Sequence, residues 1–271
     1  TWGHKSVSSI RHSDIQTWVS GIGKSHTVVA RAFGILAGIL DVAERDRRIT
    51  SNPARGVTLP RKQTTKERRY LTHEQLWAVA EHAGDNSALV LTLGYCGLRW
   101  GELVGLRVRD IDFLRRRISI TRNVVEVAGE FVIGTPKTYE ARQVPVPSLV
   151  LDALSEACAG KNRDDLVFAN SIGGYMKRTR ASKGSKSWWK TALSNADVDP
   201  MVLHDLRHTA ASLAVSAGAN VKAIQRMLGH SSAAMTLDRY ADLFDDDLEA
   251  LMERLDLAIS TRVVAKSVAS R

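Results

Sequence analysis

The sequence predicts a mainly α fold with a small antiparallel β-sheet, divided between two domains. The length of 271 residues suits two domains of roughly 150 residues each. Apolar residues recur at helical spacing along most of the chain, whereas residues 115–147 alternate β-branched and polar side chains. A polar, charged segment that opens at Pro60 separates a basic N-terminal part from the rest.

The first sixty residues predict a small helical domain. Ser13 or Asp14 can cap a short helix that ends near Gly21. Apolar residues at helical spacing predict a long helix over residues 28–49. Residues 61–70 have the composition of an exposed, basic interdomain linker.

The second domain is expected over residues 71–260, with a tail at 261–271. Thr72 and Gln75 form a capping-box signature at the start of an amphipathic helix. A second helix is predicted over residues 87–106, and from Leu149 onward the helical pattern resumes.

The stretch between these helices predicts about three antiparallel strands. Residues 115–147 alternate in the period of a half-buried strand, and turns are available at Ala128 and Gly129 and at 134–138. This is the small sheet of the predicted fold.

The charge distribution favours a polyanionic partner. Of the net charge of +9, residues 1–70 supply thirteen basic and five acidic side chains, and residues 177–190 add six basic ones. Lysines and arginines that neutralise phosphates release condensed counterions, so nucleic acid is the leading partner. A generic basic surface that aids solubility is the alternative.

Composition excludes several classes of protein. With 44% apolar and 25% charged residues, the chain is neither collagen-like nor fully disordered, and no uninterrupted apolar run approaches the roughly 18 residues of a membrane span. Cys96 and Cys158 are too few for a disulfide framework, which favours core roles in a reducing cytoplasm. Because the chain starts at Thr1, we expect a processed product or a chain that lacks an N-terminal piece.

Several polar residues of the second domain could carry chemistry, and each has a plainer explanation. Arg99 lies in an apolar segment and needs a partner, which is Glu102 or a ligand anion. His204 and Arg207 share one helical face, although His-x-x-Arg is common by chance.

Three more candidates could carry chemistry, and each of them also has a plainer explanation. His230 comes after the helix-ending Gly229, and Tyr240 lies on the next helix, where most tyrosines belong to the core. Lys137 lies in a predicted hairpin turn, where most lysines are simply solvated.

Together these residue types suit one reaction, a metal-free displacement at a phosphodiester. Arginine forks hold non-bridging oxygens, imidazole and ammonium groups move protons, and a phenol can be the covalent nucleophile. We expect no metal and no cofactor.

The order GLRWGEL, a hairpin lysine, HDLRH, LGH and a tyrosine about ten residues on resembles the tyrosine recombinase (lambda-type phage integrase) family. The LGHSSAAMTLDRYADLF segment is similar to integrases of temperate actinobacterial phages. The resemblance implies the DNA breaking-rejoining fold in the catalytic domain. It also implies a helical core-site DNA-binding domain over residues 1–60, truncated at its N-terminus.

The resemblance also implies catalytic roles. Arg99 and Arg207 would clamp the scissile phosphate, Lys137 would protonate the leaving 5′ oxygen and His204 would act as acid or base. His230 would hydrogen-bond the phosphate and Tyr240 would attack it, leaving a 3′-phosphotyrosyl link. Glu102 and His208 would orient the arginines and the helix. The step of ten residues from His230 to Tyr240 departs from the commoner nine.

The function expected is site-specific recombination of DNA, by integration or excision, in the cytoplasm of a bacterial host. The alternatives are a type IB topoisomerase and a non-catalytic DNA-binding regulator. Expected partners are double-stranded attachment (core) sites, three further copies in a tetramer and accessory DNA-bending or directionality proteins. An apolar stripe of Leu248, Leu251, Met252, Leu255 and Ile259 would dock on a neighbouring protomer or fold onto its own domain.

Plausible DNA contacts are the lysines and arginines that cluster in the linker and the basic runs. They are Lys24, Arg31, Lys62, Lys66, Arg68, Arg69, Lys177, Arg178, Arg180, Lys183 and Lys186.

Overall fold

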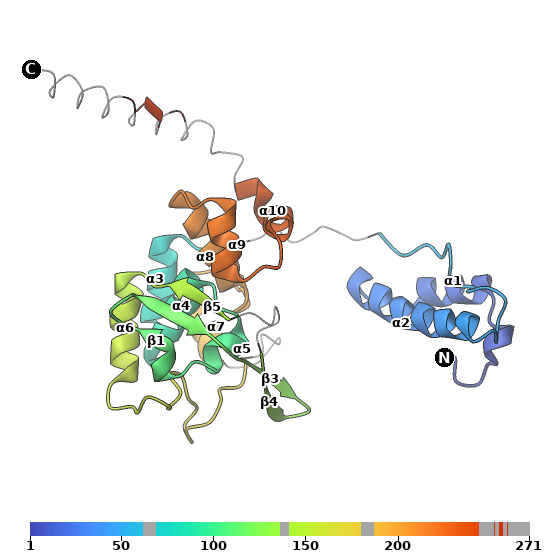
Figure 1. Ribbon diagram of the computed structural model, residues 1–271, viewed down its shortest axis with the longest axis horizontal. Helices are drawn as coiled ribbons and strands as arrows, with labels where there is room; N and C mark the ends of the chain where they lie inside the picture. The colour runs from blue at the N-terminus through green and yellow to red at the C-terminus, as the bar shows by residue number, and fades with distance from the viewer. Residues whose placement is uncertain are drawn as a thin grey trace, which may run out of the picture. The chain divides into compact units, whose positions relative to one another are not determined.

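The computed structural model describes residues 1–61, 69–135, 141–179 and 187–243, and also Met252, Leu255, Asp256 and Ile259. The chain folds as two compact units, Thr1–Glu67 and Arg68–Arg271 (Figure 1).

The N-terminal unit consists of a short 3₁₀ turn, Val7–Ser9, and two helices, α1 (His12–Gly21) and α2 (His26–Arg45). The helix α1 begins earlier than the capping pattern suggested, because Asp14 accepts the backbone N–H of Arg11 (3.2 Å) from inside the first turn. The helix α2 ends four residues before the predicted end at 49. The core contains Ile10, Ile15, Val19, Val29, Leu36, Leu40 and Ala54.

By length and composition alone, α2 is long and apolar enough to cross a membrane, with 20 residues and a mean hydropathy of 1.5. Core helices of globular proteins pass the same test. In α2, Val29, Leu36, Leu40 and Ala43 are buried against the rest of the unit, whereas 22% of the apolar window as a whole is buried.

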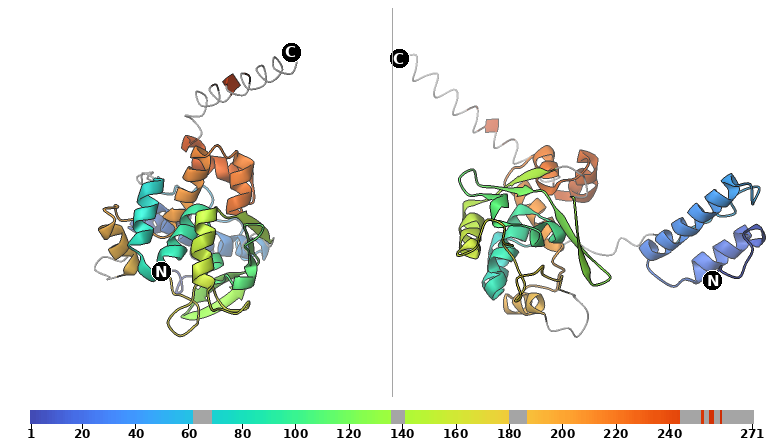
Figure 2. Two further views of the ribbon diagram at one scale, coloured as in Figure 1. Left: turned by 90° about the vertical axis from the view of Figure 1, so that its left-hand side faces the viewer. Right: turned by 60° about the horizontal axis from the view of Figure 1, so that its bottom comes forward.

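In the second unit a small sheet lies against one side of a group of helices, and the buried helix α4 packs against α3, α6 and α8 (Figures 1 and 2). The described helices are α3 (His73–Glu81), α4 (Ser87–Cys96), α5 (Trp100–Val104), α6 (Ser148–Cys158), α7 (Trp188–Asn195), α8 (Asp205–Ser216), α9 (Val221–Leu228) and α10 (Ala233–Tyr240). Short 3₁₀ turns lie at Gly84–Asn86, Val108–Asp110 and Ala241–Leu243.

The capping box predicted at the start of α3 is confirmed. The side-chain oxygen of Thr72 accepts the backbone N–H of Gln75 (3.2 Å), and Gln75 Oε1 accepts the backbone N–H of Thr72 (3.1 Å). Two of the helix's first N–H groups are satisfied in this way.

The single helix predicted over residues 87–106 is wrong, because the chain forms two helices there. Gly97 ends α4 in the left-handed conformation (φ +64°), and a Cβ at that position would lie 2.7 Å from Leu228 Cδ2. The chain turns, and α5 begins after Arg99, which therefore lies at the N-cap of α5 rather than inside a helix.

The β region also differs from the prediction of about three strands. One antiparallel sheet has the order β1-β2-β5 (Ile111–Asp112, Arg117–Ile120 and Arg142–Pro145), and β3 (Asn123–Val127) and β4 (Glu130–Gly134) form a separate hairpin. In the first sheet Ile118 faces Val144 and both are buried. Alternation predicts strands but not which of them pair.

The predicted hairpin turn at Ala128 and Gly129 is confirmed. Both residues have positive φ, 52° and 92°, as a two-residue turn between twisted strands requires. Most of the other predicted turn, 134–138, lies outside the described residues.

Helices α8, α9 and α10 enclose a second, smaller apolar cluster at the C-terminal end of the unit. It contains Ala211, Val215, Ile224, Leu228 and Tyr240. Tyr240 is the last residue of α10, so this cluster fixes the position of the predicted nucleophile.

Candidate active site

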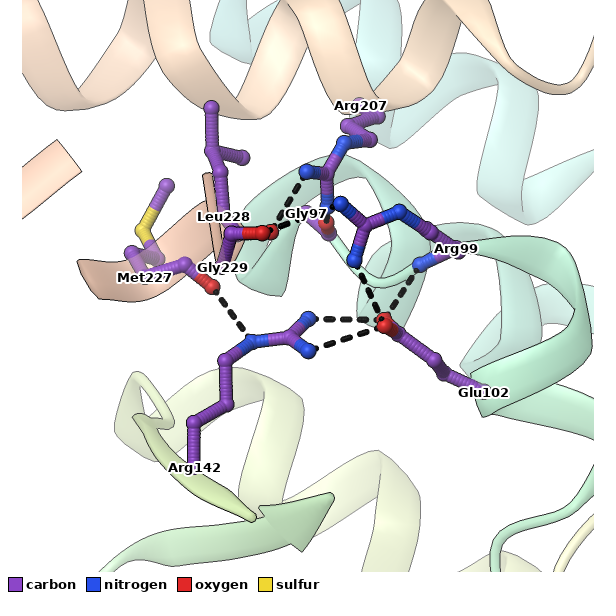
Figure 3. A network of polar contacts seen from close by, with 8 residues as sticks. All are labelled: Gly97, Arg99, Glu102, Arg142, Arg207, Met227, Leu228 and Gly229. Atoms are coloured by element: carbon purple, nitrogen blue, oxygen red, sulfur yellow. Dashed lines mark hydrogen bonds and ion pairs between the residues drawn. The ribbon is translucent and has the colours of Figure 1, made fainter. Parts of the chain in front are cut away.

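The first part of the site is a buried carboxylate between two guanidinium groups (Figure 3). Glu102, in the first turn of α5, accepts the backbone N–H of Arg99 (2.8 Å) and Arg99 Nη1 (2.8 Å). The predicted Arg99–Glu102 pair is therefore present. Arg99 Nη2 also donates to the carbonyl of Gly229 (3.0 Å), which ties α5 to the segment that carries His230.

Arg142 is the second partner of Glu102, and sequence reasoning missed it. Its Nη1 and Nη2 donate to the two carboxylate oxygens at 2.8 and 2.7 Å, and its Nε donates to the carbonyl of Met227 (3.2 Å). Arg142 and the buried Val144 are two residues apart in β5, so their side chains lie on the same face of the strand. An arginine at an inward-facing strand position was the signal that could have identified it.

The charges in this cluster stabilise one another. Burial would raise the pKa of Glu102, but the hydrogen bonds and charge of Arg142, with the backbone N–H and charge of Arg99, lower that pKa to about 2. Glu102 is therefore ionised at neutral pH. It offsets part of the positive charge that gathers here and orients both arginines.

Arg207, in the first turn of α8, is buried and joins three segments. Its Nη1 donates to the carbonyl of Gly97 at the end of α4, and its Nη2 donates to the carbonyl of Leu228 at the end of α9. Burial, followed by the charge of Arg99, lowers the pKa of Arg207 to about 9, so it is cationic at neutral pH. The side chain is held beside Arg99, as Figure 3 shows.

His230 follows α9 and faces α10. Gly229 precedes it in the left-handed conformation (φ +63°), which turns the chain toward α10. The imidazole Nδ1 lies 2.9 Å from Thr236 Oγ1, and the two groups share a hydrogen bond. Burial, and then the charges of Arg207 and Arg99, lower the pKa of His230 to about 4, so the ring is neutral at pH 7.

Tyr240 lies within the same cluster. Its side chain is 1% exposed, its ring stacks parallel to that of His230 with centroids 6.4 Å apart, and its hydroxyl lies 2.9 Å from Nδ1 of His208. The apolar part of the ring packs in the core and the phenol oxygen has a polar partner. His208 thus contacts Tyr240 itself.

His204 lies at the N-cap of α8, on the exposed side of the cluster. Its ring meets that of His208 edge to face, with centroids 5.5 Å apart. Partial burial, and then the charges of Arg207 and Arg178, lower the pKa of His204. Arg178, a predicted DNA contact, is therefore close enough to act on this histidine.

A cavity of about 670 Å³ opens on one side of the cluster. Arg99, Arg142 and His230 line one part of it, and Lys222 and Arg226 of α9 line another. Among the residues that line this cavity there are four with permanent positive charge and no acid. This composition suits a polyanion.

The structure separates the remaining predicted site residues into three groups. Lys24, Arg31 and Arg178 are exposed. Arg69 pairs with Asp199, and Lys177 pairs with Glu126 (3.4 Å). The others lie outside the described residues: Lys62, Lys66, Arg68, Lys137, Arg180, Lys183 and Lys186.

Comparisons with known proteins identify the family of this chain. The model of the phage integrase family matches residues 69–247. The prophage phiRv2 integrase of Mycobacterium tuberculosis is 28% identical over 265 residues, which cover 94% of this chain and 70% of that protein. The transposase from transposon Tn916 of Enterococcus faecalis is also 28% identical, over 94% of this chain and 68% of that protein.

The same fold occurs in solved structures. The Tn1549 transposon integrase in complex with a circular intermediate DNA superposes with a TM-score of 0.76 at 24% identity, covering 91% of this chain and 86% of that one. The predicted resemblance, including its actinobacterial phage relatives, is confirmed. This chain belongs to the phage integrase family and is a tyrosine-type site-specific recombinase.

Proposed function

We propose that this chain cleaves and rejoins double-stranded DNA at attachment sites through a 3′-phosphotyrosyl intermediate on Tyr240. The observation that carries the proposal is the convergence of Arg99, Arg207, His230 and Tyr240, from separate segments, beside a cationic cavity. Positive groups placed where charge develops stabilise a pentavalent phosphate without a metal.

In the proposed reaction the Tyr240 oxygen attacks the scissile phosphorus. The bond from phosphorus to the 5′ oxygen breaks, and the DNA strand leaves with a free 5′ hydroxyl. Arg99 and Arg207 would hold the non-bridging oxygens, which requires Arg207 to exchange carbonyl partners for phosphate oxygens. His230 would donate a hydrogen bond, His204 would act as acid or base, and Lys137 would protonate the leaving oxygen.

The two units would divide the work on DNA. The basic N-terminal unit would bind the core site with Lys24 and Arg31, and Arg178 would contact phosphates near His204. Lys222 and Arg226, which line the cavity, are further phosphate contacts that extend the predicted set.

A covalent trap tests this function. The protein is incubated with a pool of nicked duplexes and quenched with detergent, and the attached DNA is sequenced while mass spectrometry locates the modified residue. We expect a 3′ link to Tyr240 on a narrow set of sequences, and none with Tyr240→Phe. Adducts with relaxation of any supercoiled DNA would instead indicate a topoisomerase, and no adduct on any DNA would indicate a binding protein.

Assembly is a separate part of the proposal. Four copies would act on two sites, with C-terminal residues of one protomer bound to the next. Met252, Leu255 and Ile259, on the predicted stripe, are exposed. Deleting residues 246–271 should abolish strand exchange and assembly on DNA but spare DNA binding by the protomer, and unchanged assembly would refute it.

A further inference from the structure

We propose that His208 is a catalytic residue that accepts the proton of the Tyr240 hydroxyl as the phenol attacks the phosphate. This inference rests on the proposed function and assigns His208 a role beyond orienting α8. The nucleophilic oxygen and His208 Nδ1 lie 2.9 Å apart, within the range of about 2.6–3.2 Å that a general base requires.

The two side chains are positioned by packed elements. His208 is half-buried on α8, one residue after the buried Arg207, and Tyr240 ends α10 inside the cluster formed with α9. Their rings are tilted by 59° with centroids 5.7 Å apart. Because both helices contribute buried residues to one cluster, the pair is held together by the fold rather than by a loop.

The other two histidines of the site are placed for different work. His230 engages Thr236 through Nδ1 and presents its ring parallel to Tyr240, and it lines the cationic cavity. His204 contacts the ring of His208 from the exposed side. His208 contacts the reacting oxygen directly, so proton acceptance from Tyr240 falls to it.

The proposed step balances. A neutral His208 with its proton on Nε2 offers Nδ1 as the acceptor. As the bond from the Tyr240 oxygen to phosphorus forms, the proton moves to Nδ1 and the bond from phosphorus to the 5′ oxygen breaks. The leaving oxygen takes a proton from the general acid, for which Lys137 is predicted. During rejoining, the imidazolium of His208 returns its proton to the departing phenolate.

The test changes the base and the acidity of the nucleophile together. His208→Asn keeps a hydrogen-bond acceptor near the position of Nδ1 but removes a useful base. The substrate is a nicked site that the unchanged protein cleaves. On it, we expect the single-turnover rate of Tyr240 adduct formation to fall by roughly 10²–10⁴-fold in the variant. A fluorinated tyrosine at position 240 has a more acidic phenol, part of which is already ionised to phenolate. With this nucleophile, the loss of rate caused by His208→Asn should be at least tenfold smaller.

A purely structural role would produce a different pattern. His208→Asn would then slow both nucleophiles equally, and either this result or faster cleavage by the variant would overturn the inference. Ser216→Ala, an exposed change on the same helix, serves as the control, and melting temperatures check folding. If His208→Asn unfolds, His208→Gln replaces it.

The same experiment separates the inference from the function on which it rests. Failure of the unchanged protein to form any adduct would overturn the proposed function and this inference with it. A full rate with His208→Asn in a protein that does form the Tyr240 adduct would overturn the inference alone.

Discussion

Glu102 and Arg142 form a buried, two-pronged ion pair, with Nη1–Oε1 2.8 Å and Nη2–Oε2 2.7 Å. The carboxylate is fully buried, and its other bonds go to Arg99. The side chain of Glu102 thus fixes the positions of both Arg142 on β5 and Arg99 at the start of α5. Parallel N–H···O bonds of this kind define geometry as well as energy.

Removing the charge of Glu102 should therefore be costly. Glu102→Gln leaves two partly buried guanidinium groups without their counter-charge, and we expect a loss of about 3–5 kcal/mol in the free energy of unfolding. The measurement is denaturant unfolding of the full chain, together with cleavage per folded molecule. Both quantities should fall.

A matched variant separates site geometry from general stability. Asp110 pairs with Arg122 (3.0 Å) in a similarly buried setting. Asp110→Asn should lower stability but leave cleavage per folded molecule near that of the unchanged protein. Equal losses of cleavage in the two variants would contradict the orienting role of Glu102.

Gly229 should not tolerate a side chain. Its φ of +63° strains any other residue by about 1–2 kcal/mol. A Cβ there would also lie 2.9 Å from Arg142 Cδ, so Arg142 would move away from Glu102. We expect Gly229→Ala to lower both the melting temperature and the rate of DNA cleavage.

Gly84→Ala is the control for that substitution. Gly84 has a similar φ of +56°, but nothing lies within 4 Å of the Cβ position. The Gly84→Ala protein should have the same backbone strain but cleave DNA at the rate of the unchanged protein. If the two alanine variants cleave DNA equally fast, the contact with Arg142 does not matter to the site.

The neutral state of His230 makes stability depend on pH. Its pKa is about 4 in the folded chain, below the ordinary 6.5, so the unfolded chain binds more protons between these values. The contribution of neutral His230 to the free energy of unfolding is complete above pH 6.5 and is lost as the pH falls toward 4. The stabilising contribution of Glu102, whose folded pKa is about 2 against 4.5, is lost only as the pH falls below about 4.5.

The check is the free energy of unfolding between pH 7.5 and 4.5, for the unchanged protein and for His230→Gln. The unchanged protein should lose more stability as the pH falls, because its imidazole must take up a proton in a cationic, buried setting. Parallel curves would mean that His230 is not responsible. His204, whose pKa is also lowered, is present in both proteins and cancels.

Lys222 and Arg226 should contribute to DNA affinity through phosphate contact. They lie one turn apart on α9, are exposed and line the same cavity as Arg99. Each change to glutamine should weaken binding on any sequence and reduce the slope of log K against log salt by about 0.9.

Arg115, in the turn between β1 and β2, is the control for these two changes. Its side chain is 81% exposed, and it does not line the cavity. Arg115→Gln should leave the salt slope unchanged. A Lys222→Gln protein with an unchanged slope would remove that residue from the DNA interface.

The sequence by itself determined the mainly helical fold class, the order of the motifs and the chemistry that they suit. Capping and turn residues act locally, so Thr72 with Gln75 and Ala128 with Gly129 were predicted correctly. The types and order of Arg99, His204, Arg207, His230 and Tyr240 were enough to identify the family.

Only the tertiary structure decided which groups meet. Strand pairing, the break of the helix at Gly97 and the partnership of Arg142 with Glu102 depend on contacts between residues far apart in the chain. A local pattern carries no information about such contacts. The hydrogen bond between His208 and Tyr240 joins residues 32 positions apart, and it exists because α8, α9 and α10 bury one apolar cluster together.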